Sequence, residues 1–194
     1  MSFRFDFDDI YKDAIIIKLI SEWNANSKQQ VDRTTIQKLC YFAEAVDVPL
    51  GYKFSVYKHG PYSQELNEHI DDMVCTDLVT DKNSENELKT TTSSYSASED
   101  AIELLVMYKD ELSKTEDKIL FLVEYFKDKP LRDLELFSTT HYYYAANKGF
   151  FQALDENGIR DRTIKKVVEA KKGEFEHSEV LKAYLALVET PQFC

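Results

Sequence analysis

The sequence predicts a mainly α-helical protein with a small β component, in which a winged-helix-like N-terminal unit is followed by C-terminal helices. Three observations predict this class. Apolar residues recur at helical spacings of three and four over several stretches. A short run of alternating β-forming residues precedes a Gly-Pro pair, and a polar stretch rich in Ser, Thr and Asn separates two helical halves. With 43% hydrophobic and 13% aromatic residues, the 194-residue chain can bury a sizeable core.

The first half of the chain contains three predicted helices. Residues 9–24 carry apolar side chains on one face and are expected to form an amphipathic helix. A second helix covers 33–46 with Asp32 as its N-cap, and a third covers 64–76 with Ser63 as its N-cap. The apolar stripe of the second helix predicts its buried face: Ile36, Leu39, Cys40 and Ala43.

Two segments of the first half have the composition of strands. Residues 52–58 alternate between apolar and polar side chains and predict a short strand that Gly60-Pro61 ends. Residues 80–98 are polar and predict a β-hairpin. The resulting order of helix, helix, strand, helix, strand and hairpin is that of a winged helix-turn-helix unit.

The second half of the chain is predicted to be helical. Capping residues and apolar periodicity place helices over these ranges: 98–112, 113–127, 131–147, 161–172 and 179–190. We therefore expect residues 1–97 to form the winged-helix-like unit with its polar hairpin, and residues 98–194 to form a helical extension packed on it.

The balance of charged residues indicates which kind of binding partner to expect. Asp and Glu number 35 against 24 Lys and Arg, which gives a formal net charge of −11. Such a surface repels phosphate unless a local basic patch overrides it. The sequence therefore favours a protein or cationic partner over nucleic acid.

The cysteines and the hydropathy of the chain indicate the cellular compartment to expect. Cys40, Cys75 and Cys194 are far apart and give no disulfide framework or zinc motif, which favours the reducing cytoplasm. The acidic N-terminus does not have the pattern of a signal peptide. The longest apolar runs are far shorter than the ~20 residues of a membrane span, so no membrane association is expected.

No catalytic motif is present in the sequence. It contains no nucleophile elbow, no phosphate-binding glycine loop, no dinucleotide fingerprint and no HExxH pair. The four histidines are dispersed: His59, His69, His141 and His177. We therefore expect a non-enzymatic protein without a cofactor, a metal site or catalytic residues.

A family resemblance is carried by residues 36–79. They contain a Lys-Leu-aromatic-Phe helix over 38–42, a Gly-Tyr-x-Phe strand over 51–54 and a Tyr-x-x-Gly-Pro-Tyr-Ser turn over 57–63. This skeleton resembles the YwgA-like uncharacterised family, which is related to the SocA/Panacea-type antitoxin domain. The resemblance is specific over about a quarter of the chain.

The resemblance implies a winged-helix-like fold in the first half and a role in protein–protein interaction. It points to an antitoxin-like regulator or an adaptor, whose partner is a toxin or a defence-system component. For the YwgA-like relatives it implies no particular function.

The expected partner-binding surface combines the Gly-Pro turn with the acidic helix that follows. Its candidate residues are Tyr57, Lys58, His59, Tyr62, Glu65, Glu68 and Asp71. Tyrosine offers a large contact area with a polar tip, and the carboxylates suit a basic partner. The alternative for the turn is purely structural, with Tyr62 packed inside and Ser63 acting as a cap.

The alternative function is a winged-helix DNA-binding transcriptional regulator. Residues 63–77, which would include the recognition helix, carry five acidic residues and no Lys or Arg, which speaks against it. Phosphate contacts would have to come from the polar hairpin and a basic run represented by Arg160, Arg162, Lys165 and Lys166.

Two further alternatives remain open from the sequence. An enzyme with an unusual site would need a pocket lined by Tyr57, His59 and His141. The aromatic-rich stretch 137–151 could bury a homodimer face as readily as a core.

Overall fold

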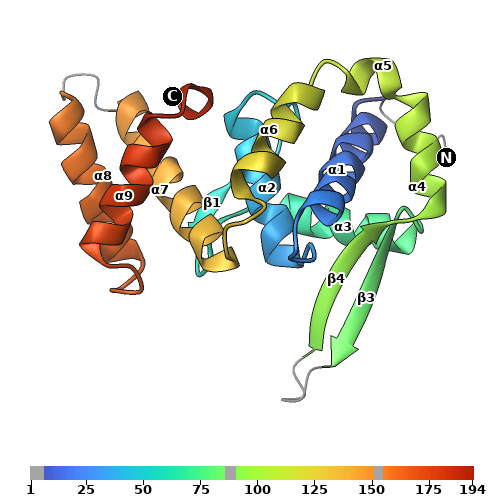
Figure 1. Ribbon diagram of the computed structural model, residues 1–194, viewed down its shortest axis with the longest axis horizontal. Coiled ribbons are helices and arrows are strands. Elements are labelled where there is room, and N and C mark those ends of the chain that lie inside the picture. Colours follow the sequence, from blue (N-terminus) through green and yellow to red (C-terminus); the bar gives the residue numbers. More distant parts are fainter. Residues whose placement is uncertain (1–6, 86–90, 151–154) are drawn as a thin grey trace. The chain divides into compact units, whose positions relative to one another are not determined.

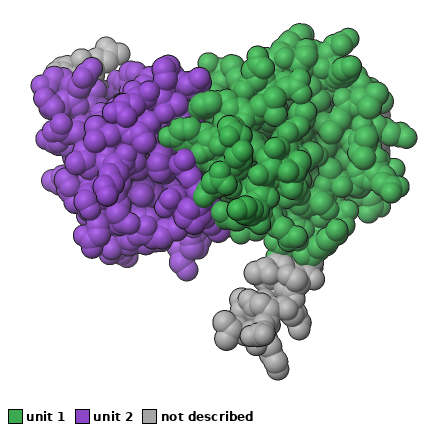
Figure 2. All heavy atoms as spheres, in the orientation of Figure 1, with its two compact units in different colours: residues 1–53, 63–128 green, residues 54–62, 129–194 purple. Residues whose placement is uncertain are grey.

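The computed structural model describes residues 7–85, 91–150 and 155–194 and is mainly helical, with two small antiparallel sheets (Figure 1). The fold class expected from the sequence is confirmed at this level. The chain packs into two compact units (Figure 2). Unit 1 comprises residues 1–53 and 63–128, and unit 2 comprises residues 54–62 and 129–194.

The elements alternate between the two units along the chain. Unit 1 holds α1 (Phe7–Asn26), α2 (Arg33–Ala45), α3 (Gln64–Cys75), β3 (Val79–Glu85), β4 (Thr91–Ala97), α4 (Glu99–Met107), α5 (Lys109–Leu112) and α6 (Glu116–Phe126). Unit 2 holds β1 (Ser55–Tyr57), β2 (Gly60–Tyr62), α7 (Leu131–Phe150), α8 (Glu156–Ala170), α9 (His177–Val188) and the 3₁₀ turn η1 (Pro191–Phe193).

The two units divide the chain differently from the boundary at residue 97 suggested by the sequence. Residues 98–128 pack with the N-terminal helices, whereas residues 54–62 pack with the C-terminal ones. That the segments 1–97 and 98–194 fold as separate domains stays a prediction.

The starts of α2 and α3 are fixed by the expected caps. Asp32 accepts a hydrogen bond from the Thr35 backbone N–H at 2.6 Å, and Ser63 accepts one from the Leu66 N–H at 3.3 Å. Gln37 of α2 also binds both backbone groups of Ser63, at 2.8 and 2.9 Å. Both predicted N-caps are therefore confirmed, and α2 sets the point at which α3 begins.

Helix α1 is the centre of unit 1. It packs on α2, α4, α6 and β4, and its middle is buried on nearly every side. The fully or almost fully buried side chains include Ala14, Ile15, Ile16, Ile17, Leu19, Ile20 and Trp23. The prediction of a one-sided amphipathic helix was wrong here, because a helix covered from several directions needs apolar residues all round.

Helix α2 buries its predicted apolar stripe, but burial extends to every residue from Thr35 to Ala43. The residues of its expected apolar stripe are all buried: Ile36, Leu39, Cys40 and Ala43. Burial raises the pKa of the Cys40 thiol far above its ordinary value. Cys40 is therefore a small packing residue held as a neutral thiol.

The Gly60-Pro61 pair lies inside a strand rather than ending one. β1 and β2 form a hairpin in which Val56 pairs with Pro61 and Tyr57 with Gly60. The prediction that this pair breaks the extended segment was wrong. β1 pairs with β2 and not with β3 or β4 in the part of the chain that the structure describes, so the sheet of a winged helix is not formed there.

The predicted polar hairpin is present as β3 and β4, which extend beyond the helices of unit 1 (Figure 1). Tyr95 anchors it, because its backbone N–H donates to Val31 at 2.8 Å and its carbonyl accepts from Asn24 at 2.8 Å. The Tyr95 ring is buried, and its hydroxyl accepts a hydrogen bond from Arg33 at 3.0 Å.

Unit 2 is built around an apolar cluster contributed by α7, α8, α9 and the segment between α8 and α9. Its buried members are Leu136, Ile164, Val167, Phe175, Val180 and Ala183. Arg132 closes one end with two hydrogen bonds to Glu179, at 2.7 and 3.1 Å, and lies over the Phe175 ring. Among the described residues, no helix is long and apolar enough to cross a bilayer.

Candidate functional site

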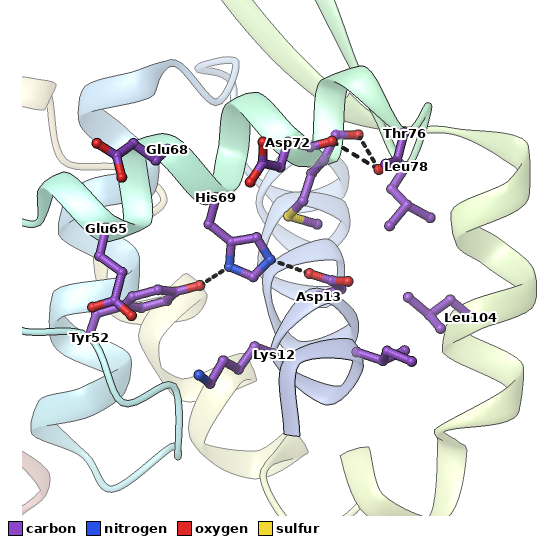
Figure 3. A pocket seen from close by; sticks show the side chains of 12 residues that line it. Lys12, Asp13, Tyr52, Glu65, Glu68, His69, Asp72, Thr76, Leu78 and Leu104 are labelled. Carbon is purple, nitrogen blue, oxygen red and sulfur yellow. Dashed lines mark hydrogen bonds and ion pairs between the residues drawn. The ribbon is translucent and has the colours of Figure 1, made fainter. Parts of the chain in front are cut away.

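The candidate site is a cavity of 680 Å³ in unit 1 (Figure 3). Helix α3 supplies one wall and α1 supplies another. Leu104 of α4, Tyr52 before β1, and Thr76 and Leu78 between α3 and β3 complete it. Its lining residues are Ile10, Lys12, Asp13, Tyr52, Glu65, Glu68, His69, Asp72, Met73, Thr76, Leu78 and Leu104. A cavity of this size is in the range that accommodates small ligands or a few side chains of a partner.

A chain of three polar side chains crosses the middle of the cavity. His69 Nε2 lies 2.6 Å from Asp13 Oδ1, and His69 Nδ1 is hydrogen-bonded to the Tyr52 hydroxyl (Figure 3). Since a carboxylate can only accept, His69 donates from Nε2 to Asp13, and in the tautomer that carries its proton there Nδ1 accepts from the Tyr52 hydroxyl. The two bonds link α1, α3 and the segment before β1.

In a carboxylate–imidazole–hydroxyl chain, the imidazole can accept the proton of the hydroxyl group. Here the hydroxyl belongs to Tyr52, a residue only 7% exposed, and its hydrogen bond points to His69. This arrangement fixes the ring of Tyr52 as a wall of the cavity. The side chains of His69 and Asp13 remain 22% and 16% exposed, so both are accessible from the cavity.

The cavity is strongly acidic. Four carboxylates line it against the single ammonium of Lys12, which gives a formal charge of −3: Asp13, Glu65, Glu68 and Asp72. The Lys12 ammonium lies 5.9 Å from the centre of the Tyr52 ring, in a cation–π arrangement. The site therefore already holds one cation of the protein itself and has an excess of negative charge around it.

The seven residues predicted to form one partner surface fall into two groups. Tyr57, Lys58, His59 and Tyr62 belong to unit 2, and Glu65, Glu68 and Asp71 belong to unit 1. Glu65 and Glu68 line the cavity, whereas Asp71 forms an ion pair with Arg33 at 2.6 Å. The structure thus brings two of the predicted residues to the cavity.

The unit 2 group is organised by a buried ion cluster under the β1–β2 turn. Glu135 lies 3.0 Å from His59 Nδ1 and 3.7 Å from Lys171 Nζ, and Lys171 also donates to the Lys58 carbonyl at 2.8 Å. The Lys171 side chain is only 3% exposed. These bonds hold the turn on α7 and α8, as the structural interpretation of the turn requires.

Gly60 gives a steric reason for a structural role of the β1–β2 turn. Its φ is +87°, and a Cβ at this position would lie 2.7 Å from Thr139 Oγ1 of α7. Only glycine combines the left-handed backbone with this close approach. On the other strand the Tyr57 side chain is exposed and its ring is tilted against that of Tyr62, with ring centroids 6.0 Å apart.

The basic run on α8 is largely neutralised by its own neighbours. Arg160 binds Asp161 at 2.9 Å and Asn157 at 3.0 Å, while Lys165 and Lys166 lie 3.9 and 3.6 Å from Glu169. A fourth cation, Arg162, donates to Asn147 at 3.2 Å. Binding of a phosphate would have to compete with these contacts.

His141 is a packed histidine. It is buried in unit 2, and its Nε2 lies 3.2 Å from the Phe193 carbonyl. Burial lowers the pKa of His141 to about 4, although this hydrogen bond favours the protonated form. His141 is therefore held neutral in the core.

Sequence reasoning missed Asp13, Tyr52, His69 and Asp72 as cavity residues. His69 lies 56 residues from Asp13 and 17 from Tyr52, so no local motif joins them. The only available signal was the placement of His69 on the same acidic helix as Glu65 and Glu68. Within the described ranges, no group of histidine, cysteine and carboxylate side chains is arranged to hold a metal ion.

Models of known protein families and the sequences of characterised proteins give no match to this chain. The resemblance to the YwgA-like and SocA/Panacea-type proteins therefore stays a prediction.

Proposed function

We propose that the chain is a non-enzymatic protein-binding module of the SocA/Panacea or YwgA type, an antitoxin-like regulator or adaptor in the cytoplasm. It binds a positively charged protein partner, such as a toxin or a defence-system component, through the acidic side of α3. The observation that carries this proposal is the acidic cavity next to that helix, whose lining combines four carboxylates with apolar side chains.

The electrostatics support a protein partner over nucleic acid. A surface with net negative charge attracts basic partners and steers their approach, while it repels phosphate. Glu65, Glu68 and Asp72 are exposed on α3, so their carboxylates are open to such a partner. The apolar lining residues, such as Leu78 and Leu104, add the hydrophobic surface that a stable protein contact needs.

The alternative function is a DNA-binding transcriptional regulator. The specific observation in its favour is the polar β3–β4 hairpin, which extends beyond the helices as the wing of a winged helix does (Figure 1). The acidic α3 and the paired cations of α8 argue against it. A duplex bound at low salt and released as salt rises would support this alternative.

The test is affinity capture of the tagged full chain from its native cells, with and without nuclease. We expect one stoichiometric protein partner that survives nuclease treatment. The double variant Glu65→Lys/Glu68→Lys should weaken binding of the purified partner by about tenfold or more, because two attractive contacts become repulsive.

The matched control is Glu103→Lys/Glu189→Lys, which makes the same charge change at two exposed positions outside the cavity. It should bind nearly as well as the unmodified chain. Recovery of nucleic acid alone, with protein partners lost after nuclease, would contradict the proposal and favour the regulator.

A further inference from the structure

The cavity of unit 1 has two chemically different ends. In Figure 3, Leu78 and Leu104 lie on one side of His69, while Glu65 and Glu68 lie on the other. Ile10 of α1 is a further apolar lining residue. The Asp13 carboxylate lies between His69 and Leu104. A ligand with an aliphatic group at one end and a positive charge at the other matches this lining.

Between these two ends, the hydrogen-bonded side chains of Tyr52, His69 and Asp13 cross the cavity. Tyr52 is tied to His69, which is tied to Asp13, so three chain segments hold the ring in place. The Lys12 ammonium over the Tyr52 ring shows that a cation is stable beside this wall. Glu65 and Glu68 bring two carboxylates to the lining against the one ammonium of Lys12, and Glu68 also accepts a hydrogen bond from Gln64 at 2.9 Å.

We infer that this cavity recognises a segment of the protein partner in which a leucine-like aliphatic side chain is adjacent to an arginine. The aliphatic side chain lies against Ile10, Leu78 and Leu104. The guanidinium group lies at Glu65 and Glu68. This inference rests on the proposed function and specifies the partner's chemistry.

Arginine fits the acidic end better than other cations. Its planar guanidinium presents several N–H donors that match two carboxylates, and it is more weakly hydrated than an ammonium group. Its aliphatic stem can follow the apolar part of the cavity while its charged end stays near the opening. A purely apolar segment would leave the carboxylates without a positive counterpart and would bury them at a cost.

The experiment is a titration of the full-length, ¹⁵N-labelled chain with the dipeptide acetyl-Leu-Arg-amide, followed by amide chemical shifts. We expect saturable shifts at residues that line the cavity, such as His69, Met73 and Thr76. Acetyl-Leu-Gln-amide lacks the guanidinium group and acetyl-Ser-Arg-amide lacks the aliphatic side chain. The affinity of each should be lower by a factor of about five or more, which corresponds to about 1 kcal/mol or more of binding free energy.

A variant separates the cavity from general attraction to an acidic surface. Leu104→Asn removes the apolar end without changing the charge and should weaken acetyl-Leu-Arg-amide about fivefold. Leu120→Asn makes the same change at an exposed position of α6 and should leave binding unchanged. Equal affinities for the three dipeptides, or no effect of Leu104→Asn, would overturn the inference.

The two proposals fail in different ways. If a protein partner is captured and lost on Glu65→Lys/Glu68→Lys, but its affinity is unchanged by Leu104→Asn, the inference is wrong while the proposed function stands. If acetyl-Leu-Arg-amide binds in the cavity but no protein partner is found, the proposed function is wrong, and with it the assignment of the ligand to a protein.

Discussion

Each unit of the molecule contains a histidine beside a carboxylate, and the two pairs have opposite settings. In unit 1, His69 and Asp13 lie 2.6 Å apart and face a cavity. In unit 2, His59 and Glu135 lie 3.0 Å apart, and the carboxylate is covered and shared with the buried Lys171. The same two chemical groups thus line an opening in one unit and fasten a turn in the other.

The difference lies in the remaining charges. In unit 2 a buried lysine balances the carboxylate and also binds the backbone of the turn. In unit 1 the carboxylates outnumber the cation, and their surroundings are open to a ligand. Balanced, buried charge indicates a structural role, whereas accessible excess charge indicates a binding role. Four experiments test whether the two units differ in this way, beginning with the largest expected effect.

Lys171→Met should have the largest effect, a loss of about 3 kcal/mol in the free energy of unfolding. The change leaves the Glu135 carboxylate buried without its lysine and removes the hydrogen bond to the Lys58 carbonyl. Chemical denaturation measures it. Lys172→Met, at the exposed neighbouring position, should cost little. Equal stability of the two variants would show that the cluster does not stabilise unit 2.

His141 should make the stability of unit 2 depend on pH. Its pKa is about 4 in the folded protein and near its ordinary value of 6.5 in the unfolded chain. Below pH 6.5 the unfolded chain takes up a proton that the folded protein does not, so stability falls as pH falls from 6.5 to 4. The full loss is roughly 3 kcal/mol.

The pH effect is measured by denaturation at pH 7, 5.5 and 4 on the unmodified chain and on His141→Gln. The variant should lack this part of the pH dependence, whatever its stability at pH 7. His177→Gln, at an exposed histidine, should retain it. An identical pH profile for the unmodified chain and His141→Gln would refute the assignment.

Gly60→Ala should cost about 2 kcal/mol, because it adds a Cβ at a positive φ and within 2.7 Å of Thr139 Oγ1. Gly149 offers the opposite case within α7, since its position has open space around it. Gly149→Ala should stabilise by up to about 1 kcal/mol through helix propensity. Thermal unfolding of both variants gives the comparison. An unchanged unfolding temperature for Gly60→Ala would mean that the turn is not held tightly on α7.

His69→Asn should have the smallest effect on stability, about 1 kcal/mol, because water in the open cavity can replace its partners. The larger change should be in ligand binding, since Tyr52 is no longer held by His69. Titration with acetyl-Leu-Arg-amide and denaturation together check this. A stability loss as large as that of Lys171→Met would show that the Asp13 pair is structural after all.

Local features of the fold were predictable from the sequence. The N-caps Asp32 and Ser63 have short polar side chains directly before helical patterns, and each binds a backbone N–H within its own first turn. The burial of the four stripe residues of α2 was predictable for the same reason, whereas the burial of the polar Gln37 and Lys38 between them was not. Such signals depend on residues only three or four positions apart.

Features set by tertiary packing were not predictable. The all-round burial of α1 depends on which elements surround it, and the pairing of β1 with β2 depends on how the turn packs on α7. The cavity joins residues from four segments, so its acidic excess emerges only when α1 and α3 meet. Of the site itself, the sequence indicated the two glutamates on α3 and no more.

Because Cys40 is buried, the rate of its chemical modification depends on opening of the folded protein. Its thiol is fully covered in α2 and strongly disfavours the reactive thiolate, whereas Cys75 and Cys194 are exposed. A thiol-modifying reagent should therefore modify the two exposed sites at once and reach Cys40 only when unit 1 opens. The rate of that third modification reports how often the core around α2 opens in the native protein, without any denaturant.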